Sequence, residues 1–290
     1  MPEPVFSVVV PTKGRPRYLT GCLEALAALD YAREDYEVVV VNDGGGAAIE
    51  ALVASFAERL AIRLAAPPRG GPAAARNAGA DAAAGRFVAF TDDDCEPEPG
   101  WLAAMERALG ADPDAAAGGR TVNGVPGDRA ATATQIVVDA LHDHFNRDAG
   151  GPRFFDSGNL AVAAGAFRDA GGFDEDFRYA EDREFCERFL GSGRRLVAAP
   201  DAIVRHMRTL TLSEFWGQHY GYGRGAWAFA RSRSGGVGRD RAGVLSEIVR
   251  AARRAGSSSR DRVAIGAYVA TSQAATAAGY AREAVRRGSG

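Results

Sequence analysis

Residues 86–94 read RFVAFTDDD, a short apolar run that passes directly into three consecutive aspartates. A run of this length and composition, bounded by turn-forming residues, predicts a buried β-strand. Two similar runs precede it, VFSVVV at 5–10 and YEVVVV at 36–41. Stretches of helical length separate the three runs, so the spacing predicts right-handed βαβ units and a parallel sheet covered by helices on both faces.

The rest of the chain extends this α/β pattern. Between the first strands we expect helices at 17–29, 47–60 and 72–84 and a strand at 62–65. Beyond residue 110 we expect strands at 115–120, 195–198 and 203–206, with helices at 133–145, near 166, at 181–190 and at 211–230. A Gly- and Ser-rich linker at 232–238 and an amphipathic helix at 244–255 follow.

Composition indicates a folded protein with an uneven charge distribution. Of the 290 residues, 46% are hydrophobic and 25% are charged, which argues against disorder. Residues 1–204 carry 20 Lys and Arg against 32 Asp and Glu, whereas residues 205–290 carry 15 against 5. A basic tail favours an anionic partner, such as a membrane surface or a phosphorylated substrate. The alternative is an Arg-rich overall usage, since Lys13 is the only lysine.

The cysteines and the apolar stretches bear on the cellular compartment. Three cysteines without a CxxC pair indicate free thiols in a reducing, cytoplasmic compartment. The N-terminus has no signal-peptide pattern. Residues 263–281 carry no charge and are about long enough to cross a bilayer, but alanine, serine, threonine and glutamine dominate them. We therefore expect a packed or surface helix there.

Polar or glycine-rich segments follow three of the expected strands, at residues 11–15, 42–46 and 91–95. In open parallel sheets, ligands bind beyond the carboxyl ends of the strands. These three segments are far apart in the sequence but share one edge of the expected sheet. The sequence therefore predicts the functional site at this edge.

The aspartate triplet is the strongest chemical signal. In an extended segment Asp92 and Asp94 lie on one face and Asp93 on the other. Two carboxylates on one face suit a hard divalent cation such as Mg²⁺ or Mn²⁺, with a diphosphate and water as further ligands. A solvated turn with helix-capping aspartates is the structural alternative, and the triplet alone does not separate the two.

Weaker signals accompany the triplet. Asp43, followed by glycine, suits a hydrogen bond from a nucleobase or ribose, although Asp-Gly is also an ordinary turn. Arg76 offers a planar fork to a phosphate. Asp182 begins a helix, where the dipole favours its ionised form, so it is a candidate general base. His206, taken alone, favours no role, and neither a Rossmann nor a P-loop fingerprint occurs.

Seven segments, in order, resemble the family 2 glycosyltransferases with the GT-A fold. The resemblance covers roughly residues 5–210 and rests on SVVVPT at 7–12, VNDG at 41–44, ARNAG at 75–79, FTDDD at 90–94, SGNLA at 157–161, GGFDE at 171–175, and Glu181-Asp182 with His206. The sequence departs from many relatives at Lys13-Gly14, where they have an aromatic residue and Asn, and at Asn42, where they have Asp.

The resemblance implies a role for each matching position. The nucleotide contacts are Pro11, Thr12, Arg15, Asp43, Arg76, Asp92 and Asp93; the metal ligands are Asp94 and His206; the base is Asp182; and the sugar and acceptor contacts are Gly158, Asn159, Glu181 and Trp216. It further implies a divalent metal, Mn²⁺ or Mg²⁺, and an inverting transfer from a nucleotide sugar, with a UDP-linked donor favoured, to an acceptor hydroxyl.

Several expectations and alternatives complete this reading. Residues 1–230 are expected to form the GT-A domain, with a nucleotide-binding half to about 120 and an acceptor half to 230, and residues 231–290 a linker and a basic helical extension. The expected acceptor is a carbohydrate, a lipid-linked molecule or a small molecule; no nucleic acid is expected, and the extension is a candidate for peripheral membrane contact. The alternatives are a nucleotidyltransferase of related fold and a non-catalytic nucleotide-sugar-binding module. The oligomeric state is left open.

Overall fold

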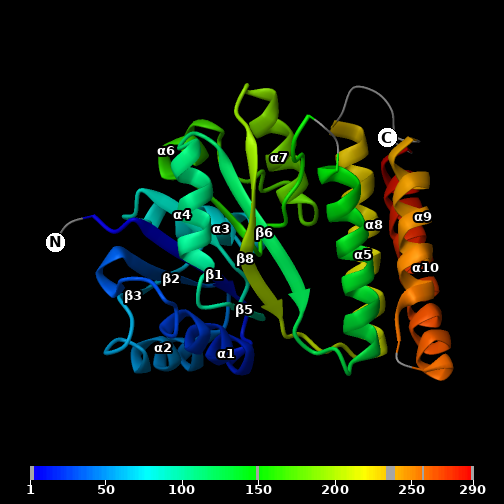
Figure 1. The fold of residues 1–290 in the computed structure, drawn as a ribbon, viewed down its shortest axis with the longest axis horizontal. Coiled ribbons are helices and arrows are strands. Elements are labelled where there is room, and N and C mark those ends of the chain that lie inside the picture. Colours follow the sequence, from blue (N-terminus) through cyan, green and yellow to red (C-terminus); the bar gives the residue numbers. More distant parts are fainter. Residues whose placement is uncertain (1–2, 148–149, 233–238, 257, 289–290) are drawn as a thin grey trace. The chain divides into compact units, whose positions relative to one another are not determined.

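The computed structural model describes residues 3–147, 150–232, 239–256 and 258–288 (Figure 1). The chain forms two compact units. Unit 1 comprises residues 1–122, 151–176 and 182–207, and unit 2 comprises residues 123–150, 177–181 and 208–290. These two units divide the chain at other positions than the domain limits expected from the sequence. Those limits stay a prediction.

Unit 1 is built on a mixed eight-stranded sheet in the order β3-β2-β1-β4-β7-β6-β8-β5. Its strands are β1 (Phe6–Thr12), β2 (Tyr36–Asn42), β3 (Ile62–Ala65), β4 (Phe87–Phe90), β5 (Cys95–Pro97), β6 (Ala116–Asn123), β7 (Leu160–Ala163) and β8 (Leu196–His206). The first four pair in parallel, as the βαβ spacing predicts. β7 is antiparallel to β4 and β6, and β5 is antiparallel to β8.

Helices cover both faces of this sheet. They are α1 (Pro16–Ala27), α2 (Gly46–Ser55), α3 (Pro72–Ala82), α4 (Trp101–Ala111), α6 (Ala164–Asp169) and α7 (Glu181–Gly191), with a 3₁₀ turn at Arg33–Asp35. Side chains alternate along each strand, so Val8 and Val10 of β1 enter a core that contains the leucines of α1, whereas Val9 enters a second core with α3 and α7. This two-sided burial confirms the expected α/β architecture.

Several element boundaries differ from the sequence-based expectations, including those of one strand and two helices. The two strands expected at 195–198 and 203–206 form the single strand β8, which runs through the exposed Pro200. α2 ends at Ser55 rather than at residue 60, and turns follow it. α5 starts at Arg129 because the Asp128 carboxylate caps it by accepting a hydrogen bond from the backbone N–H of Ala131 at 2.8 Å.

The described residues of unit 2 form four long helices, α5 (Arg129–Asn146), α8 (Leu212–Ser232), α9 (Arg239–Arg254) and α10 (Ser259–Gly288). α8 and α10 approach closely because glycine stands at their contacts: a Cβ on Gly223 would lie 1.9 Å from the carbonyl oxygen of Thr276, and one on Gly279 would lie 2.0 Å from that of Tyr220. Among the described residues, no helix is long and apolar enough to cross a membrane. The expected linker at 232–238 falls mostly on residues 233–238, outside the described ones.

A close glycine contact in unit 1 gives a stability test. A Cβ on Gly79 of α3 would lie 2.3 Å from Cγ1 of Val9 and 2.9 Å from Cγ2 of Val41. We expect Gly79→Ala to lower the free energy of unfolding by about 1–3 kcal/mol through overpacking, outweighing the helix-propensity gain of about 0.5–1 kcal/mol. Urea denaturation measures this loss. Gly110→Ala in α4 is the matched control, since open space surrounds that position; equal stability of the two variants would contradict the packing argument.

Candidate active site

The carboxyl ends of β1, β2 and β4 bring together the segments that the sequence places at the site. β1 and β2 end in register, Thr12 opposite Asn42, and the backbone N–H of Asp43 donates to the carbonyl oxygen of Thr12 at 2.8 Å. The Asp43 carboxylate accepts a hydrogen bond from the backbone N–H of Gly71 at 3.2 Å and lies 3.5 Å from Nζ of Lys13. The loop before α3 thus meets the β2 end at Asp43. Pro11 lies within β1.

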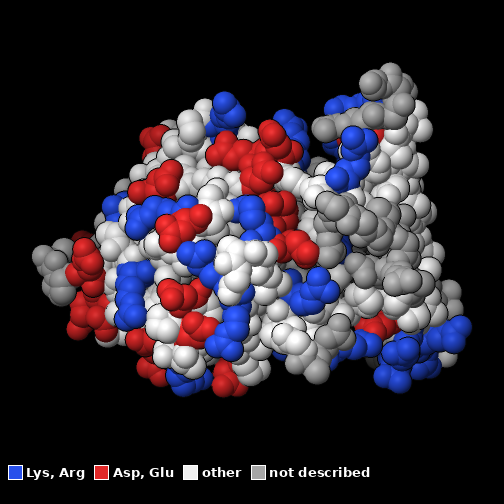
Figure 2. All heavy atoms as spheres, turned by 90° about the horizontal axis from the view of Figure 1, so that it is seen from above, with Lys and Arg blue, Asp and Glu red and all other residues white. Residues whose placement is uncertain are grey.

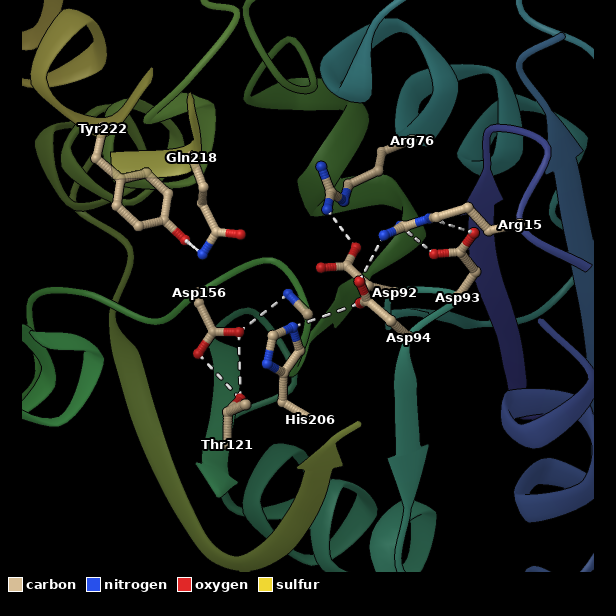
Figure 3. A network of polar contacts seen from close by, with 11 residues as sticks. Arg15, Arg76, Asp92, Asp93, Asp94, Thr121, Asp156, His206, Gln218 and Tyr222 are labelled. Atoms are coloured by element: carbon tan, nitrogen blue, oxygen red, sulfur yellow. Dashed lines mark hydrogen bonds and ion pairs between the residues drawn. The ribbon is translucent and has the colours of Figure 1, made fainter. Parts of the chain in front are cut away.

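The aspartate triplet lies in a turn after β4 and not in an extended segment. The backbone N–H of Cys95 donates to the carbonyl oxygen of Asp92 at 3.1 Å and closes this turn. Ligand atoms of Asp92, Asp94 and Cys95 nevertheless all lie within 4.8 Å of one another. Asp93 points away from them (Figure 3). The expected pairing of Asp92 with Asp94 is therefore present, although the turn rather than strand alternation produces it.

The buried Asp93 and the partly exposed Arg15 form an anchor beneath the cluster. Asp93 is fully buried, and its carboxylate accepts hydrogen bonds from the Thr12 hydroxyl at 2.6 Å and from Nε of Arg15 at 3.2 Å. Nη1 of Arg15 also lies 2.6 Å from Oδ2 of Asp94. Burial raises the pKa of Asp93 to about 6 in spite of the opposing arginine charge. In this structure Thr12, Arg15 and Asp93 therefore orient Asp94.

Arg76 fixes the first aspartate of the triplet. It projects from α3, is 5% exposed, and places Nη2 2.5 Å from Oδ1 of Asp92. Burial acts against the charged form of Asp92, but Arg76 and Arg15 together hold its pKa below the usual range. The Asp92 carboxylate therefore stays ionised, with a guanidinium beside it.

Strand pairing brings His206 to the same place. Cys95 of β5 pairs with His206 of β8, and the backbone N–H of Met207 donates to the carbonyl oxygen of Asp94 at 2.8 Å. Nε2 of His206 then lies 3.6 Å from Oδ1 of Asp94. Burial raises the pKa of the Cys95 thiol well above its usual range, so this sulfur stays protonated and is a poor ligand. Two carboxylates and an imidazole remain, a donor set that fits Mn²⁺ or Mg²⁺.

Asp182 lies in the first turn of α7, near residue 157. Its Oδ2 accepts a weak hydrogen bond from the backbone N–H of Ser157 at 3.4 Å. Burial raises its pKa to about 6, and the neighbouring charge of Asp156 adds to the rise. The helix dipole, which favours the ionised form, therefore does not set this pKa alone, because desolvation and a like charge exceed the dipole effect. A carboxylate with this pKa suits proton transfer near neutral pH.

Asp156 is a site residue that the sequence reasoning missed. Its carboxylate accepts hydrogen bonds from the Thr121 hydroxyl at 3.2 Å and from the backbone N–H of Gly158 at 3.1 Å. Burial raises its pKa to about 6, and Asp92 adds to the rise. A Cβ on Gly158 would lie 3.0 Å from Oδ1 of Asp156 and 3.2 Å from Oδ2 of Asp92, so this glycine separates two carboxylates. An acidic residue directly before Ser157-Gly158 was the available signal.

Comparison with known proteins decides the family. The family model described as "Glycosyl transferase family 2" matches residues 7–171, more than half of the chain. The chain belongs to glycosyl transferase family 2.

Relatives and solved structures agree with this membership. The chain is 31% identical over 230 residues to the pre-mycofactocin glycosyltransferase of Mycobacterium tuberculosis, covering 76% of this chain and 46% of that protein. It is 30% identical over 238 residues to the chondroitin synthase of Escherichia coli, covering 69% of this chain and 34% of that protein. The chain therefore spans half or less of the length of these two relatives.

The fold is shared with solved glycosyltransferases. The mannosyltransferase PcManGT of Pyrobaculum calidifontis, in complex with GDP-Man and Mn²⁺, superposes with a TM-score of 0.68 at 22% identity, over 96% of this chain and 86% of that one. The Staphylococcus aureus TarS fragment 1–349 in complex with UDP superposes with a TM-score of 0.56 at 19% identity, over 98% of this chain and 91% of that one. These likenesses confirm the GT-A fold.

In this family 2 member, Asn159 is placed differently from the expectation that it lies at the sugar. Its side chain is fully buried, accepts a hydrogen bond from Nε1 of Trp101 at 2.8 Å, and donates one to the carbonyl oxygen of Ala202 at 2.9 Å. Both ends of the amide are thus engaged with the interior of unit 1. Asn159 therefore supports the SGN loop from below, and Gly158 is the residue beside the carboxylates.

The remaining acceptor candidates of the family 2 chain lie in unit 2. Glu181 is buried, and Trp216 of α8 is 42% exposed. On the same helix the side-chain amide of Gln218 donates to the hydroxyl of Tyr222 at 3.0 Å (Figure 3). The proposed contacts of Glu181 and Trp216 with a sugar or an acceptor stay predictions.

Proposed function

We propose that this chain transfers a sugar from a nucleoside diphosphate sugar to an acceptor hydroxyl, with the help of a divalent cation and with inversion at the anomeric carbon. The observation that carries the proposal is the convergence of Asp92, Asp94 and His206, with Arg76 beside them, at the strand ends where Asp43 also lies. The solved neighbours that contain GDP-Man with Mn²⁺, and UDP, support it.

The metal and the diphosphate are proposed to occupy the acidic cluster. Asp94 and His206 hold the cation, and Asp92 faces the ribose. When bound, the cation neutralises charge that develops on the departing nucleoside diphosphate. Arg76 contributes a second, fixed positive charge, and its burial in α3 means that it needs no reorganisation during the reaction.

Asp182 is proposed as the general base. Inversion needs a base that removes the proton of the acceptor hydroxyl as its oxygen attacks the anomeric carbon from the face opposite the leaving group. The raised pKa of about 6 gives Asp182 more basicity than an exposed aspartate while leaving it mostly ionised at pH 7. Glycine at position 158 keeps the space beside the carboxylates open.

Asp43 is proposed to contact the nucleobase. Its carboxylate can accept an N–H of uracil or of guanine, and we propose a UDP-linked donor. A thermal-shift panel of UDP, GDP and their sugars with Mn²⁺ tests this, since a ligand that binds the folded state raises the Tm. We expect the largest shift with UDP ligands. Release of UDP from the sugar nucleotide, rather than of diphosphate from a nucleoside triphosphate, distinguishes a glycosyltransferase from a nucleotidyltransferase.

The pKa of the base gives a pH prediction. Since Asp182 must be ionised to accept a proton, we expect kcat/KM to fall below pH 6, by about ten-fold for each further pH unit. Asp156→Asn removes a like charge and should move this acid limb to lower pH. Glu187→Gln, a half-exposed carboxylate of α7, is the matched control. An acid limb at the same pH in Asp156→Asn and in the native chain would contradict the coupling.

A further inference from the structure

The last two helices of unit 2 carry a one-signed surface. Across residues 243–286, the side chains that are both charged and exposed are all arginines: Arg250, Arg253, Arg254, Arg260, Arg262, Arg282 and Arg286. On the face drawn in Figure 2, by contrast, acidic and basic side chains are interspersed over much of the surface.

The three acidic residues between positions 243 and 286 each form an ion pair, and two of them, Glu247 and Glu283, are buried. Glu247 is buried and forms an ion pair with Arg147 of α5. Asp261 lies 2.8 Å from Nη2 of Arg129, and Glu283 lies 2.6 Å from Nε of Arg224. Each of these three carboxylates is therefore paired within unit 2. Glu283 also lies 3.9 Å from Nε of Arg286, so of the seven exposed arginines Arg286 is partly compensated.

Exposed aliphatic side chains accompany these arginines. Leu245 and Val249 of α9 are 48% and 41% exposed, and Val263 of α10 is 74% exposed. On α9 they share the outward half of the helix with Arg250 and Arg253, while Ile248 on the opposite half packs into the core of unit 2. The end of α9 and the start of α10 follow each other in the sequence, so these aliphatic and basic residues gather at one hairpin.

The exposed side of α10 is also apolar. Between Arg262 and Arg282, its exposed positions are alanines and one valine: Val263, Ala267, Ala270, Ala274, Ala277, Ala278 and Ala281. A seam of this spacing also suits another helix. If two copies packed through α10, parallel or antiparallel, the arginines at the ends of one helix would lie against those of the other, and like charges would meet. A partner with negative charge around an apolar interior fits both the exposed arginines and the exposed apolar side chains.

We propose that the α9–α10 hairpin, residues 243–286, docks on the surface of an anionic phospholipid bilayer. Arginines bind the headgroup phosphates, and Leu245, Val249 and Val263 enter the boundary between headgroups and acyl chains. The aliphatic residues among the arginines favour a bilayer over a nucleic acid. The bilayer contact needs no nucleotide sugar, so it stands or falls separately from the proposed transferase activity.

Co-sedimentation of the full chain with vesicles tests the proposal. Vesicles of phosphatidylcholine alone are compared with vesicles of equal parts phosphatidylcholine and phosphatidylglycerol. We expect binding only to the anionic vesicles, and loss of binding when the NaCl concentration rises from about 0.1 M to about 1 M, which shortens the screening length from about 10 Å to about 3 Å.

Matched variants separate the hairpin from the general charge. Each arginine near an anionic surface contributes about five-fold in affinity, so R253Q/R254Q should weaken binding at least ten-fold. R107Q/R195Q, which removes two exposed arginines of unit 1, should leave binding unchanged. V249S/V263S should weaken binding without changing its salt dependence. Equal sedimentation of the two arginine variants, or equal binding to both kinds of vesicle, would overturn the proposal. A third result would also overturn it. In this result the chain sediments as a dimer without vesicles, and A270E on α10 dissociates the dimer but leaves vesicle binding unchanged.

Discussion

Asp182→Asn should lower the rate of sugar transfer by about 10²–10⁴-fold while the nucleotide sugar still binds. This range is what a positioned general base contributes to proton transfer. Asparagine keeps the shape of the side chain and can still accept the hydrogen bond from Ser157, so the loop that it contacts should hold its place. Steady-state kinetics with the donor, together with calorimetric titration of UDP, separates loss of chemistry from loss of binding.

A control variant on the same helix tests whether the loss of rate is specific to Asp182. Glu187→Gln changes a half-exposed carboxylate of α7 by the same chemistry and should leave the rate unchanged. Turnover of Asp182→Asn within a few-fold of the native rate would remove Asp182 from the role of base. Asp156 would then be the next carboxylate to test, because it lies beside Ser157 and Gly158 and its pKa is also raised to about 6.

Asp94→Asn should remove the dependence of nucleotide binding on the divalent cation. Asp94 presents one oxygen to Arg15 and the other towards His206, so it links the anchor of Arg15 and Asp93 to the second proposed metal ligand. Asparagine lacks the negative charge, so a hard cation held by Asp94 and His206 would lose its charged protein ligand. We expect the affinity for UDP measured with Mn²⁺ to fall to the value measured without it.

The native chain titrated with and without Mn²⁺ supplies the reference for this measurement. Glu106→Gln, an exposed carboxylate on α4, serves as the surface control. If UDP bound Asp94→Asn with an undiminished response to Mn²⁺, the metal would have to lie elsewhere. Circular dichroism and thermal unfolding of the variant show whether the ion pair with Arg15 is needed for folding, and Asp94→Glu provides a charged variant for comparison.

Local sequence patterns were enough to predict the parallel strands and the edge of the sheet at which their polar ends meet. The β-branched runs of β1, β2 and β4 are long enough and apolar enough to specify buried parallel strands, and the polar residues after them necessarily share an edge. The antiparallel strands β6, β7 and β8 were harder to predict because their pairing joins distant segments. The Pro200 in β8 reads as a strand break although the strand runs through it at an exposed position.

The candidate site was predictable in residue identity but not in electrostatics. Asp92, Asp94, Arg76, His206 and Asp182 stand out by type and position. Whether a carboxylate has a low or a raised pKa depends on burial and on charges from distant segments, as Asp156 shows for Asp182. For the same reason Asn159, a polar residue in a glycine-containing loop, was expected at a ligand, but in the structure it supports Trp101.

We propose that the acidic cluster binds a cation and a nucleotide together. A crystal structure of the chain with UDP and Mn²⁺, with anomalous scattering recorded for manganese, would show whether it does. We expect one anomalous peak bound by Asp94 and His206 and in contact with the UDP diphosphate, with the uracil at Asp43. A manganese peak away from both residues, or UDP bound elsewhere on the chain, would contradict the account.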